Sequence, residues 1–537
     1  MRAWLFHLAA GSALASVATL GAMDSHIVGP RALGMGGVGT ATAHDHNASF
    51  WNPAMYGWFW MTNADGGPVP ADANFIGRKD WGIGLLDLGV AAEVQGQLAD
   101  WIDRLAQADV SRLQNLGTAQ ANPRDIEWAL TTLDAFNRFV PDRDFVSVQT
   151  QLSVLNIRVW RLGLGVRQFA EALVGFADVD RVNLGFGTNT LQQVVNDINQ
   201  TPMPAGYSSA HQPTVFVPGT PTYTFLYNAL GGGAAADEAI RRMDFAAQQA
   251  GITQQQVDSL VGATGVGPLI QAINGSGFNA STSIANNQTA AIAIAYTATE
   301  VPLTFGWPID ERFAVGGNLK LIVGQIGAAK VRLARDTDDL SQYVQDSLEN
   351  AQQSITGSID LGVAARWGWG QLGLTGRNLS YPTLAGGRYQ DADGQWFRVD
   401  DIELEPQVAA GIALYPHETL CFAAEIDVTE NRTRFRTVSE RPALPPGTQR
   451  ELEFETASQR LGLGAEWDIL RVLALRAGGS YDFAAPEPAW MLHAGLGLDL
   501  WLIRFDAGGA LSTKTIMINK EEYPQAFAVA AGAAIDF

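Results

Sequence analysis

The sequence predicts an all-β transmembrane barrel of about 14 antiparallel strands, with two long, partly helical extracellular loops. Three observations lead to this fold class. The chain begins with a short basic and apolar segment typical of exported proteins. Many later segments alternate between apolar and polar residues, and the last of them ends on an aromatic residue. These segments are even in number, and short and long connections alternate between them, as in single-chain bacterial barrels.

Residues 1–22 are expected to be a secretory signal peptide. Arg2 provides the positive start, residues 8–20 are small and apolar, and cleavage is expected after Ala22, with cleavage after Ala18 as the alternative. A membrane anchor is the competing interpretation, but the stretch is shorter than the ~20 residues with which a helix crosses a bilayer. The mature chain is therefore expected to be exported.

The end of the chain carries the clearest alternation. Residues 527, 529, 531, 533, 535 and 537 are apolar, whereas those between them are Ala, Gly or Asp. A period of two is that of a strand with two different faces. This segment resembles the closing strand of bacterial outer-membrane barrels. The resemblance implies that Phe537 is an assembly signal for the barrel assembly machinery.

Fourteen segments are predicted to be strands: 78–90, 144–156, 158–170, 288–306, 312–327, 356–367, 371–380, 405–415, 419–428, 456–467, 471–483, 489–499, 502–513 and 525–537. If the C-terminus lies in the periplasm, the periplasmic side receives only short connections and the other side receives the long ones. The connection 484–488 is a short exception on that other side. Outer-membrane barrels show this asymmetry.

One face of these strands mixes glycine with isolated charges, whereas the other is apolar. A soluble sandwich also alternates, but its polar face is rich in Lys, Thr and Ser. We therefore expect the apolar face to meet membrane lipid and lipopolysaccharide, and the charged face to line the lumen. The charges expected in the lumen are Asp360, Arg366, Arg377, Glu425, Asp427, Arg460, Glu466, Arg476, Asp499, Arg504 and Asp506.

Two insertions, 91–143 and 171–287, are long enough to hold structure of their own. Apolar residues recur near helical spacing in the first, and helices are expected around 191–198, 234–250 and 253–273 in the second. Residues 201–223 are rich in Pro, Ser and Thr and are expected to be irregular. The helices either pack on one another over the barrel mouth or line a site for an apolar ligand.

Composition excludes several classes of function. The net charge of −20 argues against nucleic-acid binding, which needs clustered cations. The single cysteine, Cys421, permits neither an internal disulfide nor a thioredoxin-like pair of cysteines. We find no catalytic constellation and expect no enzyme activity and no cofactor.

Three other motifs resemble ligand-binding sites, but a structural role explains each of them more simply. The glycines of 34–39 superficially fit a dinucleotide loop, but no buried parallel strand precedes them, and they more simply allow a compact backbone. His44 and His46 offer metal-type donors, but a hydrogen-bonding role is favoured over a metal site. Asp391 and Asp393 lack the distal Glu of a calcium loop and are expected in a solvated acidic loop.

Residues 23–77, which precede the first strand, carry a family resemblance. The runs GPRALGMGG at 29–37 and NASFWNPA at 47–54 resemble the N-terminal hatch of FadL-type outer-membrane proteins, and more closely the branch labelled TraF-like. EVPLTFGW at 300–307, GRNL at 376–379 and EIDVTEN at 425–431 fit the same branch. The resemblance covers most of the mature chain, with little contribution from 171–287.

The resemblance implies that residues 23–77 are a hatch that blocks the lumen of a barrel formed by 78–537. The hatch and gate residues that it implies are Asn47, Phe50, Trp51, Asn52, Pro53 and Ala54. Pro53 fixes φ and biases Asn52 away from helix, so a rigid turn is expected there. The neighbouring aromatic cluster either packs the hatch against the wall or meets a ligand; its possible ligand contacts are Met55, Tyr56, Trp58 and Phe59.

Two functions follow from these expectations. The better-understood members of the family move long-chain fatty acids or other hydrophobic compounds, so the resemblance implies passive uptake of a hydrophobic small molecule across the outer membrane. The alternative is an outer-membrane scaffold, or a secretion or conjugation partner, that binds other proteins through its long loops.

Overall fold

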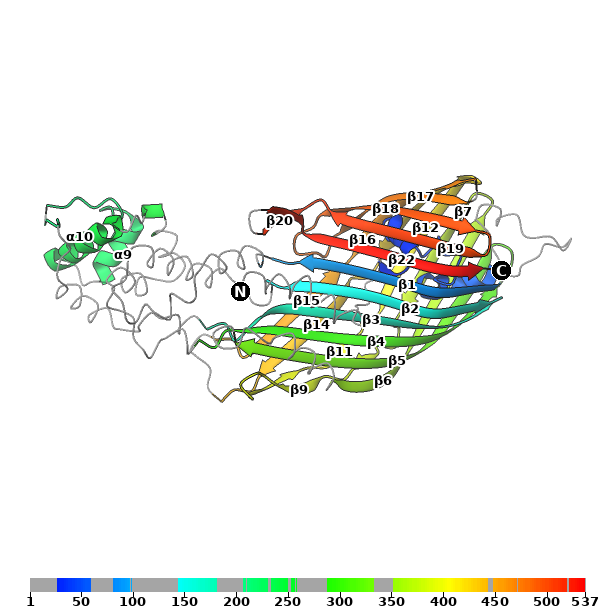
Figure 1. Ribbon diagram of the computed structural model, residues 1–537, viewed down its shortest axis with the longest axis horizontal. Helices are drawn as coiled ribbons and strands as arrows, with labels where there is room; N and C mark the ends of the chain where they lie inside the picture. The colour runs from blue at the N-terminus through cyan, green and yellow to red at the C-terminus, as the bar shows by residue number, and fades with distance from the viewer. Residues whose placement is uncertain are drawn as a thin grey trace.

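Fourteen antiparallel strands close into a barrel in the computed structural model of the chain (Figure 1). The structure describes residues 27–58, 81–96, 98, 143–180, 206–208, 210–229, 233–249, 253–255, 257, 287–332, 351–442, 448–470, 472–518 and 521–536. The barrel strands, in their order around the ring, are β1 (Trp81–Val94), β2 (Val146–Val159), β3 (Leu162–Ala177), β4 (Ala290–Pro308), β5 (Phe313–Arg332), β6 (Gln352–Trp367), β7 (Gly370–Arg377), β12 (Gln407–His417), β13 (Leu420–Asp427), β16 (Arg460–Ile469), β17 (Leu473–Asp482), β18 (Trp490–Leu500), β19 (Ile503–Ser512) and β22 (Ala526–Asp536).

The first and last strands close the ring. β1 pairs with β22 in a register that places Val90 opposite Val529, with an irregularity between Gly84 and Leu86. A closed barrel has no free edge, so every strand finds hydrogen-bond partners on both sides. The predicted fourteen-stranded antiparallel barrel is confirmed.

The strand bounds differ from the predicted ones by a few residues. β3, for example, continues to Ala177, well into the insertion predicted from residue 171, and β5 continues to Arg332. The far end of β3, from Phe169 on, is buried on both faces. Its sequence therefore lacks the apolar–polar alternation from which the strands were predicted.

The outer surface of the barrel is apolar. Most strands expose a large hydrophobic side chain outward, among them Leu88, Val154, Leu164, Leu303, Leu319, Leu361, Leu374, Phe422, Leu463, Leu475, Leu492, Phe505 and Val529. Exposed tryptophans gather where the strands meet the short turns: Trp81, Trp160, Trp307, Trp369, Trp467 and Trp501. An apolar band bordered by aromatic residues is the surface that a bilayer requires of a barrel. Among the described residues, no helix is both long and apolar enough to cross a bilayer.

The connections differ between the two ends of the barrel. Six short turns join β2 to β3, β4 to β5, β6 to β7, β12 to β13, β16 to β17 and β18 to β19, as predicted from the sequence, although the turn between β2 and β3, at 160–161, lies inside the segment predicted as the strand 158–170. We call their end of the barrel, which also holds the chain's last strand residues, the turn end (Figure 1). The opposite end, which receives the long connections, is the loop end.

The loop end contains secondary structure that was only partly predicted from the sequence. It comprises the helices α9 (Pro221–Ala229) and α10 (Gly233–Gln249) and the strands β8 (Thr383–Leu384), β9 (Gly387–Gln390), β10 (Trp396–Val399), β11 (Ile402–Glu403), β14 (Asn431–Ser439), β15 (Glu451–Ser458), β20 (Thr515–Ile518) and β21 (Glu521–Pro524). α10 coincides with the helix expected at 234–250, whereas α9 begins inside the segment expected to be irregular. The helices expected within 91–143 and at 191–198, and most of the one at 253–273, lie outside the described residues.

Four of these strands form a sheet in the order β15-β14-β10-β9, which we call the mouth sheet. Its inner face packs on inward-facing side chains of the wall: the rings of Phe435 and Tyr296 lie 5.8 Å apart, and the Tyr389 hydroxyl donates to the Ile326 carbonyl at 2.6 Å. Its outer face carries exposed ion pairs such as Arg434 with Glu455. The mouth sheet therefore covers part of the loop end.

Ion pairs also hold the mouth sheet to the wall. Arg441, which follows β14, donates to Asp391 at 2.5 Å and lies 3.8 Å from Asp178 at the end of the wall strand β3. Arg332 pairs with Asp393. The expectation of a solvated acidic loop at Asp391 is wrong, because this carboxylate is buried and has a guanidinium as its partner.

Candidate functional site

Residues 27–58 lie inside the barrel, and we call them the inner segment. They form α3 (Pro30–Gly34), α4 (Ala48–Trp51) and the short 3-10 helix η3 (Pro53–Trp58), and almost all of their side chains are buried. Figure 1 shows their dark blue ribbon among the barrel strands. The inner segment contacts strands on opposite sides of the ring, including β4, β5 and β6 through η3 and β17, β18 and β19 through α3.

Glycines of the wall allow this close contact. A Cβ added to Gly316 would lie 2.4 Å from the Pro53 backbone, one added to Gly373 would lie 2.2 Å from the Thr40 carbonyl oxygen, and one added to Gly464 would lie 2.2 Å from that of Met35. Any larger residue would collide with backbone there. The glycines on the charged face of the strands thus leave the space that the inner segment fills.

A chain of alternating charges joins the inner segment to the wall at two points. At one end, Arg31 binds Glu466 through two hydrogen bonds of 2.6 and 2.8 Å. At the other end, Arg504 donates to Asp45 at 2.8 Å. Arg476 and Asp506 connect the two ends, with contacts of 2.6 Å from Arg476 to Glu466, 2.6 Å from Arg476 to Asp506 and 3.0 Å from Arg504 to Asp506. Because each buried charge has an opposite neighbour, none pays the full cost of desolvation.

The contact with Arg504 keeps Asp45 charged. Burial opposes its ionisation, but the Arg504 guanidinium outweighs burial and lowers the pKa of Asp45 below its usual value.

Glu425 of β13 is a third anchor between the inner segment and the wall. Its carboxylate accepts hydrogen bonds from the backbone amides of Gly39 and Thr40, both at 2.7 Å, and from the Thr40 hydroxyl at 2.8 Å. The loop of the inner segment is therefore held by its backbone.

A fourth anchor joins His46 of the inner segment to Asp87 of β1. The His46 Nε2 lies 2.8 Å from Asp87, which also accepts a hydrogen bond from the Asn47 side chain at 3.0 Å. Burial disfavours the imidazolium, but the charge and hydrogen bond of Asp87 raise the pKa of His46 above its usual value. His44 differs: burial, followed by the charge of Arg31, lowers its pKa to about 3, so His44 is neutral. Both histidines make hydrogen bonds, His44 with the Thr42 carbonyl at 3.0 Å.

The residues predicted to form the gate lie together and are buried. Asn52 donates to the carbonyls of Thr40 and Val363, both at 3.1 Å, and accepts a hydrogen bond from the Ala54 amide at 3.0 Å. Asn52 is extended, and Pro53 begins η3. One side-chain amide thus joins two parts of the inner segment to β6, which makes this turn a fixed point.

Cations of the wall cover the aromatic rings of the inner segment. The Arg377 guanidinium lies 4.6 Å from the Phe50 ring and 5.7 Å from that of Trp51, and the Arg366 guanidinium lies 4.5 Å from the Trp58 ring. Such contacts are attractive and become stronger when desolvated. Trp58, Met55 and Tyr56 are buried against the wall, and Phe59 lies outside the described residues.

The eleven charges predicted to line the lumen are found in two groups. Seven are buried: Asp360, Arg366, Arg377, Glu425, Glu466, Arg476 and Arg504. The other four are half-buried: Asp427, Arg460, Asp499 and Asp506. Most of them contact the inner segment or one another. Asp499 lies at the turn end, where it accepts the Trp501 amide at 2.9 Å.

Sequence reasoning missed several partners of these residues. Lys320 pairs with Glu300 at 3.1 Å and with Asp360 at 3.0 Å, and none of these three side chains is exposed. Asp87, which forms a hydrogen bond with His46, was also not predicted. A signal existed, because each missed residue is a lone charge in an apolar strand and shares the parity of the inward-facing positions.

A continuous apolar cluster, which we call the apolar column, connects the mouth sheet with the inner segment. It includes Phe397, Phe435 and Phe454 of the mouth sheet, Phe169, Leu173, Ile294 and Tyr296 of the wall, and Phe50, Met55 and Trp58 of the inner segment. The rings of Phe50 and Phe169 lie 5.7 Å apart at the junction. The apolar column therefore lies on the side of β3 to β5, where Arg167, Glu300 and Lys320 are also buried, and opposite the chain of charges on β16 to β19.

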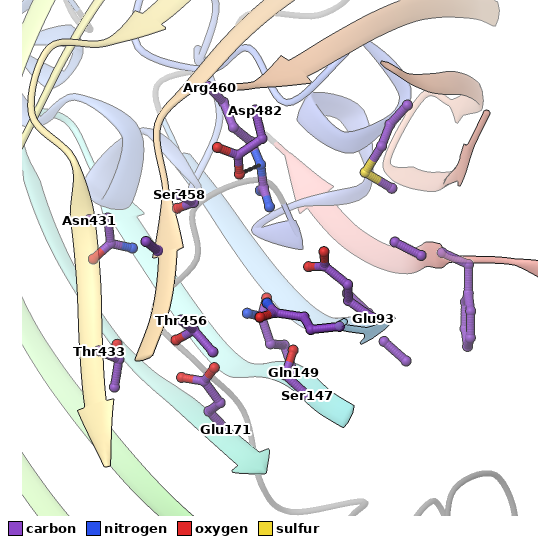
Figure 2. Close-up of a pocket in the computed structure, with 17 residues that line it drawn as sticks. Glu93, Ser147, Gln149, Glu171, Asn431, Thr433, Thr456, Ser458, Arg460 and Asp482 are labelled. Atoms are coloured by element: carbon purple, nitrogen blue, oxygen red, sulfur yellow. Dashed lines mark ion pairs between the residues drawn. The ribbon is translucent and has the colours of Figure 1, made fainter. Parts of the chain in front are cut away.

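A small polar chamber lies beside the mouth sheet at the loop end. It has room for about 50 Å3 and is bounded by β1, β2 and β3 on one side and by the base of the β14–β15 hairpin on the other. Figure 2 shows side chains from both sides pointing toward one another, with the Arg460–Asp482 ion pair at one edge. Hydroxyl, amide and carboxyl groups dominate this lining.

These features define the class of protein. A closed antiparallel barrel with an apolar exterior and a charged, filled lumen is a transmembrane barrel of the bacterial outer membrane. The chain belongs to the family described as "F plasmid transfer operon, TraF, protein", whose model matches residues 69–427. The predicted TraF-labelled branch is thereby confirmed. No curated protein sequence matches the chain.

Several solved structures are similar to this one. The toluene transporter TbuX of Ralstonia pickettii is 11% identical with a TM-score of 0.43, and the match covers 96% of this chain and all of that one. For the toluene transporter TodX of P. putida the values are 12% and 0.43, with 96% and 99% coverage. For a FadL homologue of Pseudomonas aeruginosa they are 9% and 0.43, with 97% and 100% coverage.

Proposed function

We propose that the protein is a channel for passive uptake of hydrophobic small molecules, such as long-chain fatty acids, through the outer membrane. The observation that carries this proposal is the apolar column inside the lumen. A channel for polar solutes needs a wetted lumen, whereas here aromatic and aliphatic side chains run from the mouth sheet to Phe50 and Trp58 of the inner segment. An apolar solute gains about 25 cal/mol for each Å2 that it buries on such a surface.

In this proposal the inner segment is the hatch. It fills the lumen, so no polar solute passes, and the ion pairs of Arg31 and Asp45 keep it attached to the wall on the side of β16 to β19. On the other side Phe50, Met55 and Trp58 make apolar contacts with the wall, and arginines of the wall cover the rings of Phe50 and Trp58. A hydrophobic ligand that follows the apolar column therefore reaches Phe50 and Trp58 without breaking the ion pairs of Arg31 and Asp45.

The test is uptake by the purified protein in liposomes. We expect the parent to admit a fluorescent long-chain fatty acid and to exclude a small polar dye. Deletion of 47–54 removes the gate residues and should abolish the selectivity, admitting the polar dye. Deletion of 485–488, in the short connection between β17 and β18 at the loop end, is the matched control. Heat-modifiable mobility shows that each barrel is folded. A folded deletion variant that excludes the dye and takes up fatty acid normally would refute the gate.

A scaffold role is the second candidate, and the outer face of the mouth sheet favours it. Exposed arginines and glutamates alternate there, with Arg434 close to Glu405 and Glu455, and Arg436 close to Glu451. Exposed ion pairs contribute little to stability, so such a surface is available to a protein partner. If the parent binds no hydrophobic ligand but loses a partner on substitution of Arg434 and Arg436, the scaffold replaces the channel.

A further inference from the structure

We propose that the polar chamber at the loop end binds the head group of the ligand, and that this head group is a neutral hydroxyl, as in a long-chain alcohol or a phenol, and not a carboxylate. This inference rests on the proposed function and narrows its ligand class, so that a long-chain alcohol is the tighter and a fatty acid the weaker ligand of the same channel. It is carried by the chemistry of the chamber lining and by the position of the chamber above the inner segment.

The chamber is built from paired positions on two separate elements. On the β14–β15 hairpin, Thr433 lies opposite Thr456, and Asn431 lies opposite Ser458. On the wall, Gln149 of β2 lies next to Glu171 of β3. Figure 2 shows the labelled side chains of both elements pointing into the space between them. A small molecule in this space therefore meets polar groups on two sides.

These polar groups match a hydroxyl. The side-chain hydroxyls of Thr433, Thr456 and Ser458 can each donate and accept, and the amides of Gln149 and Asn431 offer both kinds of atom. An alcohol or phenol also donates one hydrogen and accepts others. Such a ligand can replace the hydrogen bonds that its head group gives up when it leaves water.

A carboxylate matches the chamber less well. Among the lining side chains, Arg460 is the one cation, and it is already committed to Asp482 at 3.3 Å. Asp482 in turn accepts the Gln459 amide at 2.8 Å. A fatty-acid carboxylate would have to lose its hydration without gaining a guanidinium or ammonium of its own, which is costly.

One side of the chamber is apolar and leads toward the inner segment. Met491 lines it together with alanines of β1 and β22. Met491 and Ala91 also belong to the apolar contacts around Ile27 of the inner segment. A space of about 50 Å3 holds a head group of a few atoms, not a whole ligand. The apolar part of the ligand must then extend out of the chamber along this side.

The experiment compares 1-decanol with decanoate, which have the same chain length, as competitors of a fluorescent apolar probe on the purified full-length protein in detergent. We expect decanol to bind at least about tenfold more tightly at neutral pH, equivalent to one or two hydrogen bonds. The double variant Thr433→Val, Thr456→Val removes two hydroxyls at nearly constant volume and should reduce decanol affinity by roughly threefold to tenfold, with little effect on decanoate.

Thr437→Val is the matched control, because Thr437 lies on the same face of β14 but does not line the chamber. A second variant, Thr456→Lys, supplies a cation and should reverse the preference toward decanoate. Equal or tighter binding of decanoate by the parent, or an unchanged preference in both chamber variants, overturns the inference. If the probe binds and liposome uptake is intact while the preference is absent, only the head-group site fails. If the parent neither binds nor admits any hydrophobic compound, the channel itself fails.

Discussion

Individual residues determine how closely the inner segment and the wall can approach. Gly316 and Gly373 face backbone atoms of the inner segment, whereas Gly357 has nothing closer than 3.6 Å to an added Cβ. The sequence showed that the charged face of the strands is rich in glycine, and the family resemblance implied a hatch in the lumen, but neither showed which residues meet which glycine. The reason is that the backbone contacting each glycine lies hundreds of residues away in the chain.

Substitution of these glycines should displace the inner segment without unfolding the barrel. In Gly316→Val and Gly373→Val the new side chain collides with backbone of the inner segment, and backbone cannot rotate away as a side chain does. We expect faster amide hydrogen exchange in 40–54 and increased permeability to a polar dye. Gly357→Ala should leave both unchanged. Normal protection of 40–54 in the two valine variants would contradict the close packing described for this region.

Partners of buried charges are equally hard to derive at this scale. The parity of a strand places Glu466 and Arg504 in the lumen, as predicted. It does not reveal that Arg31 and Asp45, more than 400 residues earlier in the chain, bind them. The same applies to His46, for which a hydrogen-bonding role was expected but Asp87 was not foreseen.

The pair of His46 and Asp87 predicts a pH dependence. The pKa of His46 is raised in the folded protein, so its protonated form stabilises the inner segment. This contribution is complete below the ordinary histidine pKa of about 6.5 and is lost as the pH rises through the raised value. Hydrogen exchange of 44–50 should therefore accelerate as the pH increases above neutrality, after correction for the intrinsic rate. In His46→Gln this additional acceleration should be absent; its persistence would assign it to another group.

Whole elements were predictable where the two faces of a strand differ. Apart from the far end of β3, which is buried on both faces, most of the barrel strands have an apolar outer face and a face of small or charged residues, and all fourteen lie in the predicted order. The mouth sheet was missed although β14 also alternates, with Arg432, Arg434 and Arg436 on one side and Phe435 on the other. The strands of the mouth sheet lie in connections between wall strands, so the sequence offers no sign that these connections fold back over the lumen.

Phe435 should hold the mouth sheet in place. Its side chain is fully buried against Tyr296, so Phe435→Ala should cost about 3–5 kcal/mol of local stability. We expect trypsin to cleave at the arginines of β14 in this variant while the barrel core survives on a gel. Arg434→Gln, which alters an exposed ion pair on the other face, should change stability by at most ~1 kcal/mol. Equal protease resistance of both variants would mean that the sheet does not depend on this contact.

At the scale of the whole molecule, polar and apolar residues are distributed in the opposite way to that of a water-soluble protein. The large aliphatic residues of the barrel face outward, whereas buried ion pairs and glycines fill much of the interior. This arrangement is unstable in water and favourable in a bilayer, where strand hydrogen bonds must be satisfied within the closed sheet. Alternation alone could not distinguish the two environments. The identity of the residues on the polar face, with glycine and single charges instead of lysine and threonine, made that distinction.

The membrane environment can be tested with two leucines that are both exposed. Leu361 lies in the middle part of β6 and is 56% exposed, and Leu470 lies in the turn between β16 and β17 and is 88% exposed. In a bilayer, Leu361→Arg places a charge in hydrocarbon and should cost about 2–4 kcal/mol, whereas Leu470→Arg lies at the interface and should cost no more than ~1 kcal/mol. Urea titration of the protein folded into liposomes measures both. If Leu361→Arg is as stable as Leu470→Arg, the outer surface of β6 is not in contact with lipid, because exposed leucine in water tolerates arginine at either site.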